Sequence, residues 1–495
     1  MNYGLIYFVI YLFIVAWLSW YGMKKTKDLR SFAIGSGDVG AITTALTFAA
    51  TFVSAGTFLG LTGQAYAIGM SVIWFPMGQW LPAMLGLALM AAGYRLVSDK
   101  MKSLTLGDWL GDRYNSHFLR VFVALVTLLN IMYVGAQFVG VGIIMEQIMG
   151  VPYNVGVVIG IGIVVAYIFI GGTYAHVYTN VFQGAMMAVV AVAVVVLGAT
   201  KFPDILHSLP AALAAQDPKL VGYLNPSFPA YATPVAIIGI FVAHLFWGIN
   251  PHLINKVQYL KGKGEIRKFI LWTGFFMFIM GIVTFGGLYA RVLVPGLPKP
   301  DAAIPALIGM LFPKAIGGLF LVTLIAATMS TTDGLMVYLA TVFGNTLYKE
   351  TWIKYREFKG HVVDKQHVEK VAYEISKWGT IVIGILALPV AWSQPKFLIT
   401  LLWVGSCGVL STVAGPILVG VWSKKAHKKA AWVAAVGGLV GYLYLYMGGI
   451  TKSVYLAGAQ GCTISVVLML IATYMLKPYP DEDYSGYFPE KVKQA

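Results

Sequence analysis

The sequence predicts an all-α, polytopic membrane protein, and three observations predict it. The chain of 495 residues is 58% hydrophobic and only 11% charged, and its mean hydropathy of +0.76 lies outside the range of soluble domains. Apolar runs of about 20 residues, long enough to cross roughly 30 Å of hydrocarbon as helix, recur along the whole length. Strand-like alternation does not occur in the sequence, so we expect helices rather than barrel strands to satisfy the backbone.

Thirteen membrane-spanning helices are predicted within one transmembrane domain, residues 1–495. In chain order they cover about residues 3–22, 38–67, 70–94, 118–148, 154–171, 180–200, 234–250, 268–291, 316–346, 378–392, 397–421, 430–448 and 454–476. The first run is too long for the core of a signal peptide and follows no basic region, so we read it as a retained helix.

The distribution of Lys and Arg predicts the topology. The formal net charge is +15, and one set of loops, with the tail at 477–495, collects most of the 35 Lys and Arg residues. These loops lie near Lys24, Arg95, Lys256 and Lys424 and between positions 349 and 377. By the positive-inside rule this side is cytoplasmic, which places the N-terminus outside and the tail inside. We therefore expect a multi-pass protein of the cell membrane.

The opposite, outer side carries two Pro-rich loops. One covers residues 201–233, and the other reads "VPGLPKPDAAIPALIGMLFPKAI". Within the second, residues 302–311 are predicted to form a short interfacial helix.

Two predicted spans are unusual for helices that face lipid. Residues 45–69 are rich in Gly, Ser, Thr and Ala, with Ser54, Ala55 and Gly56 at the centre. Such residues suit a broken helix, whose backbone groups turn toward a ligand. The run "AATMSTTDG" at 326–334 carries Asp333, a carboxylate that is costly in hydrocarbon unless it is compensated. This pairing is typical of inverted-repeat transporters, and tight packing through small residues is the alternative.

Five motifs together identify a family. They are "SAGTFLGLTGQAYAIG" at 54–69, "VYTNVFQG" at 177–184, "FWGINPH" at 246–252, "AATMST" at 326–331 and "AGP" at 414–416. The chain resembles the sodium/solute symporter family, in its sodium/pantothenate-like or sodium/proline-like branch, over nearly its whole length.

The resemblance implies a LeuT-like core of two inverted five-helix repeats that works by alternating access. The repeats would be residues 38–200 and 234–421, with one extra helix at 3–22, two at 430–476 and a cytoplasmic tail at 477–495.

A sodium ion is the cofactor that the resemblance implies. Its ligands would be the backbone carbonyls of Ala50, Val53 and Ala327 and the hydroxyls of Ser330 and Thr331. Five oxygens without a thiol or an imidazole suit a hard monovalent cation. The alternative for the two hydroxyls is a bond to a carbonyl one turn earlier in the same helix.

Asp333 departs from the family pattern. Family members with a second sodium site place an Asp at the position of Asn180, and hydroxyls at those of Asp333 and Gly334. Three interpretations stay open. Asn180 and Asp333 could form a second cation site, with the charge supplied by the other helix. Asp333 could instead accept a proton or pair with a basic side chain, or it could be a structural aspartate bonded to Thr179 or Thr332.

The resemblance also implies a substrate site at the membrane midplane, beside the break in the first core helix. Hydroxyls, free amides and an amide side chain would bind the solute, and aromatic residues would form its gate and walls. By position, the implied residues are Ser54, Ala55, Gly56, Thr57, Gln137, Phe246 and Trp247, with Gln79, Tyr133, His244, Trp403 and Ser406 as weaker candidates. For the histidine and the aromatic residues the alternative is packing.

The same positions limit the substrate class. Gly56 and Thr57 stand where the galactose branch needs Glu and Gln, so a sugar is poorly supported. The apolar "GIIM" at 142–145 replaces an arginine of other branches, which disfavours a dicarboxylate. We expect a small monocarboxylate, a short organic acid or pantothenate, with proline or another neutral amino acid as the alternative.

Other function classes find little support in the sequence. A membrane enzyme would need a catalytic cluster, and no HExxH, GxSxG or Cys/His set occurs. A transporter-like sensor would need a fused signalling domain. Cys407 and Cys462 both lie in apolar segments, so neither a disulfide nor a Cys-based metal site is indicated. The expected partners are a small solute and the lipid bilayer, without nucleic acid, and a monomer is expected to suffice.

Overall fold

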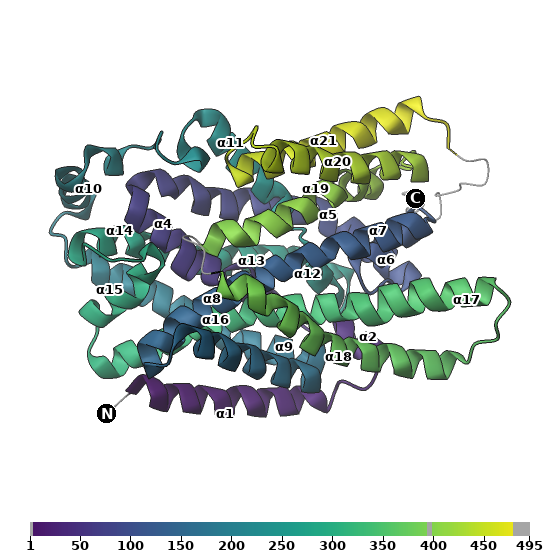
Figure 1. The fold of residues 1–495 in the computed structure, drawn as a ribbon, viewed down its shortest axis with the longest axis horizontal. Helices are drawn as coiled ribbons and strands as arrows, with labels where there is room; N and C mark the ends of the chain where they lie inside the picture. Colours follow the sequence, from purple (N-terminus) through teal and green to yellow (C-terminus); the bar gives the residue numbers. More distant parts are fainter. Residues whose placement is uncertain (1–2, 394–397, 479–495) are drawn as a thin grey trace, which may run out of the picture.

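The computed structural model describes residues 3–393 and 398–478, and the regular structure of this part is helical. Its longer helices lie roughly along one axis (Figure 1). The α-helices of the first half are α1 (Tyr3–Met23), α2 (Leu29–Ile34), α3 (Ala41–Phe52), α4 (Thr62–Ile68), α5 (Trp74–Met101), α6 (Leu106–Arg113), α7 (His117–Thr127), α8 (Ile131–Met149), α9 (Tyr153–Ala199), α10 (Ile205–Gln216), α11 (Pro234–Trp247) and α12 (Pro251–Ile254).

The α-helices of the second half are α13 (Ile266–Gly281), α14 (Thr284–Leu293), α15 (Ala303–Leu311), α16 (Lys314–Thr341), α17 (Lys354–Phe358), α18 (Lys365–Trp392), α19 (Leu398–Trp422), α20 (Lys428–Met447) and α21 (Val454–Met475). Four short helices also matter below: η1 (Gly56–Leu61), η6 (Asn255–Tyr259), η8 (Pro300–Ala302) and η9 (Val342–Ile353).

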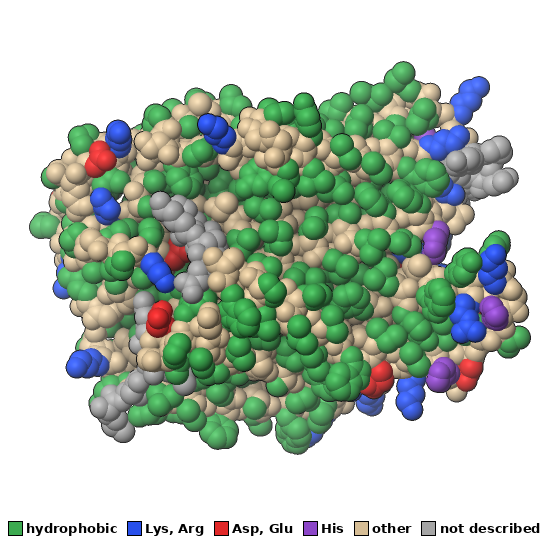
Figure 2. All heavy atoms as spheres, viewed as in Figure 1, with side chains coloured by type: hydrophobic (Ala, Val, Ile, Leu, Met, Phe, Trp, Pro, Cys, Tyr) green, Lys and Arg blue, Asp and Glu red, His purple; other side chains and the backbone are tan. Residues whose placement is uncertain are grey.

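The molecule has the surface of a membrane protein. Among the described residues, ten helices are long and apolar enough to cross a bilayer, or up to eleven if the bent pair Pro234–Trp247 and Pro251–Tyr259 forms one span. Hydrophobic side chains cover the middle of the visible face, and charged side chains gather mainly at the two ends of the long axis (Figure 2). The beginning of α1 and the end of α21 lie at opposite ends of this axis (Figure 1).

The helix α9 joins two of the predicted spans. Its 47 residues would extend about 70 Å at 1.5 Å per residue, more than twice the thickness of the hydrocarbon. Gly172 interrupts it with φ 51° and ψ −139°, a conformation that glycine adopts readily. Residues 173–179, which the prediction leaves between two spans, are therefore helical.

The first core helix is broken where its small residues predict a break. α3 ends at Phe52, Val53 leaves the helical region with ψ 81°, and the π-helix η1 starts at Gly56. A Cβ atom on Gly56 would lie 2.7 Å from the side chain of Leu402. The absence of that atom lets α19 pack directly against the break.

α16 lies at the centre of the bundle, packed against α9, α1, α8, α18 and α3. Every residue from Val322 to Thr341 is buried, so protein surrounds this helix over about 30 Å at 1.5 Å per residue. Polar side chains on such a helix meet other protein groups rather than lipid.

The structure corrects the predicted lengths and surroundings of several segments. α18 starts at Lys365 instead of 378, because Asp364 caps its first turn by accepting from the amides of Gln366 and His367. The short outer helix is α15, close to its predicted bounds. Lys256, which the topology prediction treats as a loop cation, is fully buried. Its segment folds back into the bundle as η6.

Candidate functional site

Oxygen atoms of α3 and α16 meet at the centre of the bundle. The Ser330 hydroxyl lies 2.9 Å from the carbonyl oxygen of Ala50 and 3.1 Å from that of Ala327. The Ser330 hydroxyl therefore brings three of the five predicted sodium ligands together. Their groups are a hydroxyl and two carbonyls, the hard oxygen donors that a sodium ion takes.

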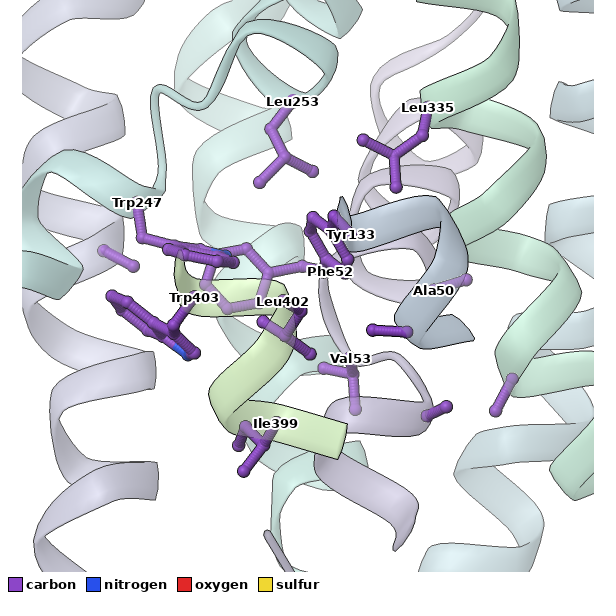
Figure 3. Packing of buried hydrophobic residues seen from close by; sticks show 14 of the residues in the cluster. Ala50, Phe52, Val53, Tyr133, Trp247, Leu253, Leu335, Ile399, Leu402 and Trp403 are labelled. Carbon is purple, nitrogen blue, oxygen red and sulfur yellow. The ribbon is translucent and has the colours of Figure 1, made fainter. Parts of the chain in front are cut away.

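The other two predicted ligands lie beside this cluster. The Thr331 hydroxyl donates to the carbonyl of Thr51 at 2.8 Å, one residue along from Ala50. Val53 is the residue at which α3 ends. It lies next to Ala50 in the close view of the break (Figure 3).

Asn180 braces the same region from α9. Its side-chain amide donates to the Thr51 hydroxyl at 2.9 Å and to the Ser330 carbonyl at 2.8 Å. Asn180 therefore ties α3 to α16 through its donor atoms. Within the described part of the chain, Asn180 forms no hydrogen bond with Asp333, so the structure does not bring these two predicted cation ligands together in that way.

Asp333 binds a different set of groups, all from α9. One carboxylate oxygen lies 2.7 Å from His176 Nδ1, and the other accepts from the hydroxyls of Tyr167 at 3.1 Å and Thr179 at 3.3 Å. His176 Nε2 in turn contacts the Nζ atom of Lys256. Thr332, the other hydroxyl considered for Asp333, donates to the Thr328 carbonyl instead.

Four buried polar residues of α9 repeat at helical spacing. His176, Thr179, Asn180 and Gln183 are each 0% exposed, and positions i, i+3, i+4 and i+7 lie on one face. The first two bind Asp333, Asn180 binds α3 and α16, and Gln183 donates to Tyr11 of α1. This face is the polar wall beside the oxygen cluster of Ser330, Ala50 and Ala327.

Pairing explains how these charges persist inside the bundle. A Lys or Asp at the centre of a membrane helix costs about 2.5–3.5 kcal/mol on insertion scales. Removing one partner of a buried ion pair costs about 3–5 kcal/mol, because the other charge is left uncompensated. Asp333 and Lys256 are both 0% exposed, so each depends on the connection through His176.

A small cavity adjoins the helix break. Its volume is about 20 Å³, close to that of one water-sized probe. The lining residues come from six elements and the break itself: Phe52, Ser54, Gly56, Thr57, Phe75, Gln79, Tyr133, His244, Trp247, Ile399, Leu402 and Trp403. This volume is too small for an organic solute, so binding requires the walls to move apart.

Aromatic rings form most of the cavity wall. The ring centroids of Trp247 and Trp403 are 3.9 Å apart, and His244 lies between Phe75 at 4.6 Å and Trp403 at 4.9 Å. Figure 3 shows the two tryptophans side by side near the helix break. His244 Nδ1 is bonded to the Ile240 carbonyl at 2.8 Å, which fixes the ring in place.

Polar groups of the lining are few and uncharged by type, apart from the imidazole. Gln79 donates to the Thr57 hydroxyl at 3.1 Å, and the Ser54 hydroxyl accepts from the amide of Gly56 at 3.0 Å. Gln137 lies behind the lining, and its side-chain oxygen accepts from the Ala55 amide at 3.2 Å. These bonds satisfy the backbone that the break exposes.

The structure thus sorts the predicted substrate residues. Eight of them line the cavity: Ser54, Gly56, Thr57, Gln79, Tyr133, His244, Trp247 and Trp403. Ala55, Gln137, Phe246 and Ser406 do not, although Gln137 contacts the break.

Ser406 belongs to a neighbouring polar chain. It donates to Asn130 at 3.0 Å, which donates to Asn250, and Asn250 is bonded to His252. Sequence reasoning missed this chain, as it missed the apolar lining residues Phe52, Phe75, Ile399 and Leu402. Their only signal is proximity to the break in the fold.

One known protein family matches most of the chain. The model of the SSF, or sodium:solute symporter, family matches residues 32–441. That range contains both the oxygen cluster and the cavity. In the described residues, no group of three or more His, Cys, Asp or Glu side chains could hold a metal ion.

Relatives of known name are similar over nearly their whole length. The sodium/pantothenate symporter of Escherichia coli (strain K12) is 28% identical over 481 residues, which cover 94% of each chain. The sodium/proline symporter of Staphylococcus aureus (strain JH9) is 25% identical over 448 residues, 87% of this chain and 83% of that one. A solved Na⁺-coupled sialic acid symporter has the same fold, with a TM-score of 0.76 at 18% identity, over 96% of this chain and 98% of that one.

Proposed function

Because the chain belongs to the sodium:solute symporter family, we propose that it imports a small organic solute together with sodium by alternating access. Members of the family are sodium-coupled transporters rather than enzymes, and sodium is the coupling ion. The observation that carries the proposal is the oxygen cluster of Ser330, Ala50 and Ala327 beside a broken helix and an aromatic cavity.

The proposed architecture is thirteen spans, of which ten form two inverted repeats at residues 38–200 and 234–421. The kink at Gly172 supports counting α9 as two spans, and the opposite positions of the two chain ends support an odd total. The proposed location is the cell membrane, with the N-terminus outside. The basic loops near Lys24 and between 349 and 377 support this orientation.

The proposed sodium ligands are the carbonyls of Ala50, Val53 and Ala327 and the hydroxyls of Ser330 and Thr331. A bound sodium ion would attract these oxygens, which come from α3 and α16, and so hold the two helices together. Neighbouring side chains fix the positions of α3 and α16 around these oxygens. Asn180 does so from α9, where it donates to the Thr51 hydroxyl and the Ser330 carbonyl. The Ser330 and Thr331 hydroxyls donate across the same interface, to the carbonyls of Ala50 and Thr51.

A small monocarboxylate is the proposed substrate class, and a short organic acid or a pantothenate-like compound fits it. The lining holds no Lys, Arg, Asp or Glu, which disfavours solutes that need a fixed counter-charge. The hydroxyls of Ser54 and Thr57 are donors suited to one carboxylate. The similarity to the sodium/pantothenate symporter supports this choice.

Proline or another neutral amino acid is the second candidate. The tilted pair Trp247 and Trp403, with Phe75 edge-on to Trp403, suits a compact apolar ring, and an aromatic face also attracts an ammonium group. The similarity to the sodium/proline symporter supports this alternative.

Uptake into proteoliposomes tests the proposal. Labelled pantothenate, proline and a panel of short monocarboxylates would be offered with and without an inward sodium gradient. We expect one class to accumulate only with the gradient, and Ser330→Ala to abolish that accumulation. Thr323→Val is the matched control, because its hydroxyl bonds only within α16, to the Leu319 carbonyl at 3.1 Å. Sodium-independent uptake of every solute, or full activity of Ser330→Ala, would refute the proposal.

A further inference from the structure

Lys256 is a buried cation that the described function does not use. It lies in η6, just after the 43° bend between Pro234–Trp247 and Pro251–Tyr259, and its side chain is 0% exposed. Its Nζ atom contacts His176 Nε2 and lies 5.5 Å from the ring centroid of Tyr259. The ammonium therefore points into the interface with α9 rather than toward water.

An imidazole connects this ammonium to Asp333. A carboxylate accepts hydrogen bonds only, so His176 Nδ1, 2.7 Å from Asp333, carries the hydrogen of a neutral ring. Nε2 then accepts from the Lys256 ammonium. The positive and negative charges are thereby linked through one neutral side chain, and their formal sum is zero.

The space around Asp333 is filled by donors. Tyr167 and Thr179 donate to its second oxygen, and His176 occupies the side of the first. A Cβ atom on the neighbouring Gly334 would lie only 3.0 Å from the His176 ring. Because Gly334 has no side chain, the His176 ring occupies the space that the side chain of another residue would fill. The carboxylate is thus contacted by three side chains of α9, and the Lys256 ammonium lies on the far side of one of them, His176.

The Lys256 chain stands close to the proposed sodium cluster but separate from it. Asp333 follows Ser330 by three residues on α16, a rise of about 4.5 Å along the helix. Asn180 directly follows Thr179, which contacts Asp333, but its own amide donates to the Thr51 hydroxyl and the Ser330 carbonyl on the sodium side. Each site thus has its own ligands.

We infer that Lys256 is a built-in second cation: its ammonium compensates Asp333 in place of a second sodium ion and limits the protein to one coupled sodium. This role rests on the proposed function and deepens it. Lys256 acts through His176 as a positioning residue that sets the sodium stoichiometry. With a monocarboxylate, transport would then carry no net charge, whereas with a zwitterion it would carry one positive charge per cycle.

Equilibrium binding of radioactive sodium to the purified full-length protein tests this role, with sodium alone as the probe. We expect one ion per chain in the wild type and in Lys256→Arg, which keeps the charge. Lys256→Met keeps a long side chain without the charge and exposes the Asp333 carboxylate to a new cation, so we expect two ions. The double variant Lys256→Met with Asp333→Asn should return to one.

The outcomes separate this inference from the proposed function. Two ions in the wild type, or one ion in a Lys256→Met protein that elutes as a single species on gel filtration, would overturn the inference alone. If Lys256→Met does not fold, Asp333→Asn decides: one retained ion supports the role of Lys256, and loss of the ion overturns it. A wild type that binds no sodium would overturn the proposed function itself.

Discussion

From the buried carboxyl of Asp301 we predict that the free energy of unfolding falls as pH rises toward 7. It lies in η8, outside the spanning helices, and is only 3% exposed. Burial raises the pKa of this carboxyl from 3.8 to about 7, although the amide of Leu398 donates to it at 3.2 Å and opposes the rise. Its other oxygen has no hydrogen-bond partner among the described residues. The folded protein therefore holds the proton more tightly than the unfolded chain.

The sign follows from the number of bound protons in each state. Between pH 4 and pH 7 the folded state keeps this proton and the unfolded state has lost it, so the free energy of unfolding falls as pH rises. From pH 5 to pH 7 the loss is about 1.4 kcal/mol per pH unit, or about 3 kcal/mol in total as an upper bound. Asp301→Asn cannot lose a proton and keeps an oxygen for the Leu398 amide.

Thermal unfolding of the purified protein between pH 5 and pH 8 measures this effect. We expect the stability of Asp301→Asn relative to the wild type to increase with pH and to level off above pH 7. Asp364→Asn is the matched control, because Asp364 is an exposed N-cap and Asn caps equally well. Parallel curves for Asp301→Asn and the wild type over the whole range would refute the reasoning.

Two further predictions concern packing and the helix break. Gly86→Ala should abolish recovery of folded protein on gel filtration, because its Cβ would lie 1.7 Å from the Leu245 carbonyl oxygen, whereas Gly162→Ala, with nothing within 4 Å, should be recovered normally. Gln137→Leu removes the acceptor of the Ala55 amide, and a buried unpaired donor costs about 1–3 kcal/mol, so we expect sodium-driven uptake to fall about tenfold or more. Wild-type uptake by this variant would show that the break is held by other groups.

The sequence predicted the features that depend on local composition. The small residues at 54–56 placed the helix break, because a helix without bulky side chains lets its backbone turn outward. The hydroxyls of "AATMST" placed Ser330 opposite α3, since the family resemblance supplied the partner helix. Asp333 was identified as anomalous from its surroundings alone, since an isolated carboxylate is costly in an apolar span.

The partners of Asp333 could not be predicted, because their positions depend on tertiary contacts. His176 lies between two predicted spans, since hydropathy does not detect that the second helix begins directly after the kink at Gly172. Lys256 was counted with the cytoplasmic charges because polar runs next to an apolar segment usually form loops. Only the return of η6 into the bundle reveals that this ammonium is buried.

The burial of every residue of α16 from Val322 to Thr341 bears on how the chain assembles during synthesis. Its carboxylate would enter the hydrocarbon alone if this helix left the ribosome before its neighbours. Tyr167, His176, Thr179 and Lys256, however, all precede Asp333 in the chain, and domains form from the N-terminal end as they are made. The receiving groups are thus already in the membrane when Asp333 arrives, so the order of translation itself protects the most costly side chain of the fold.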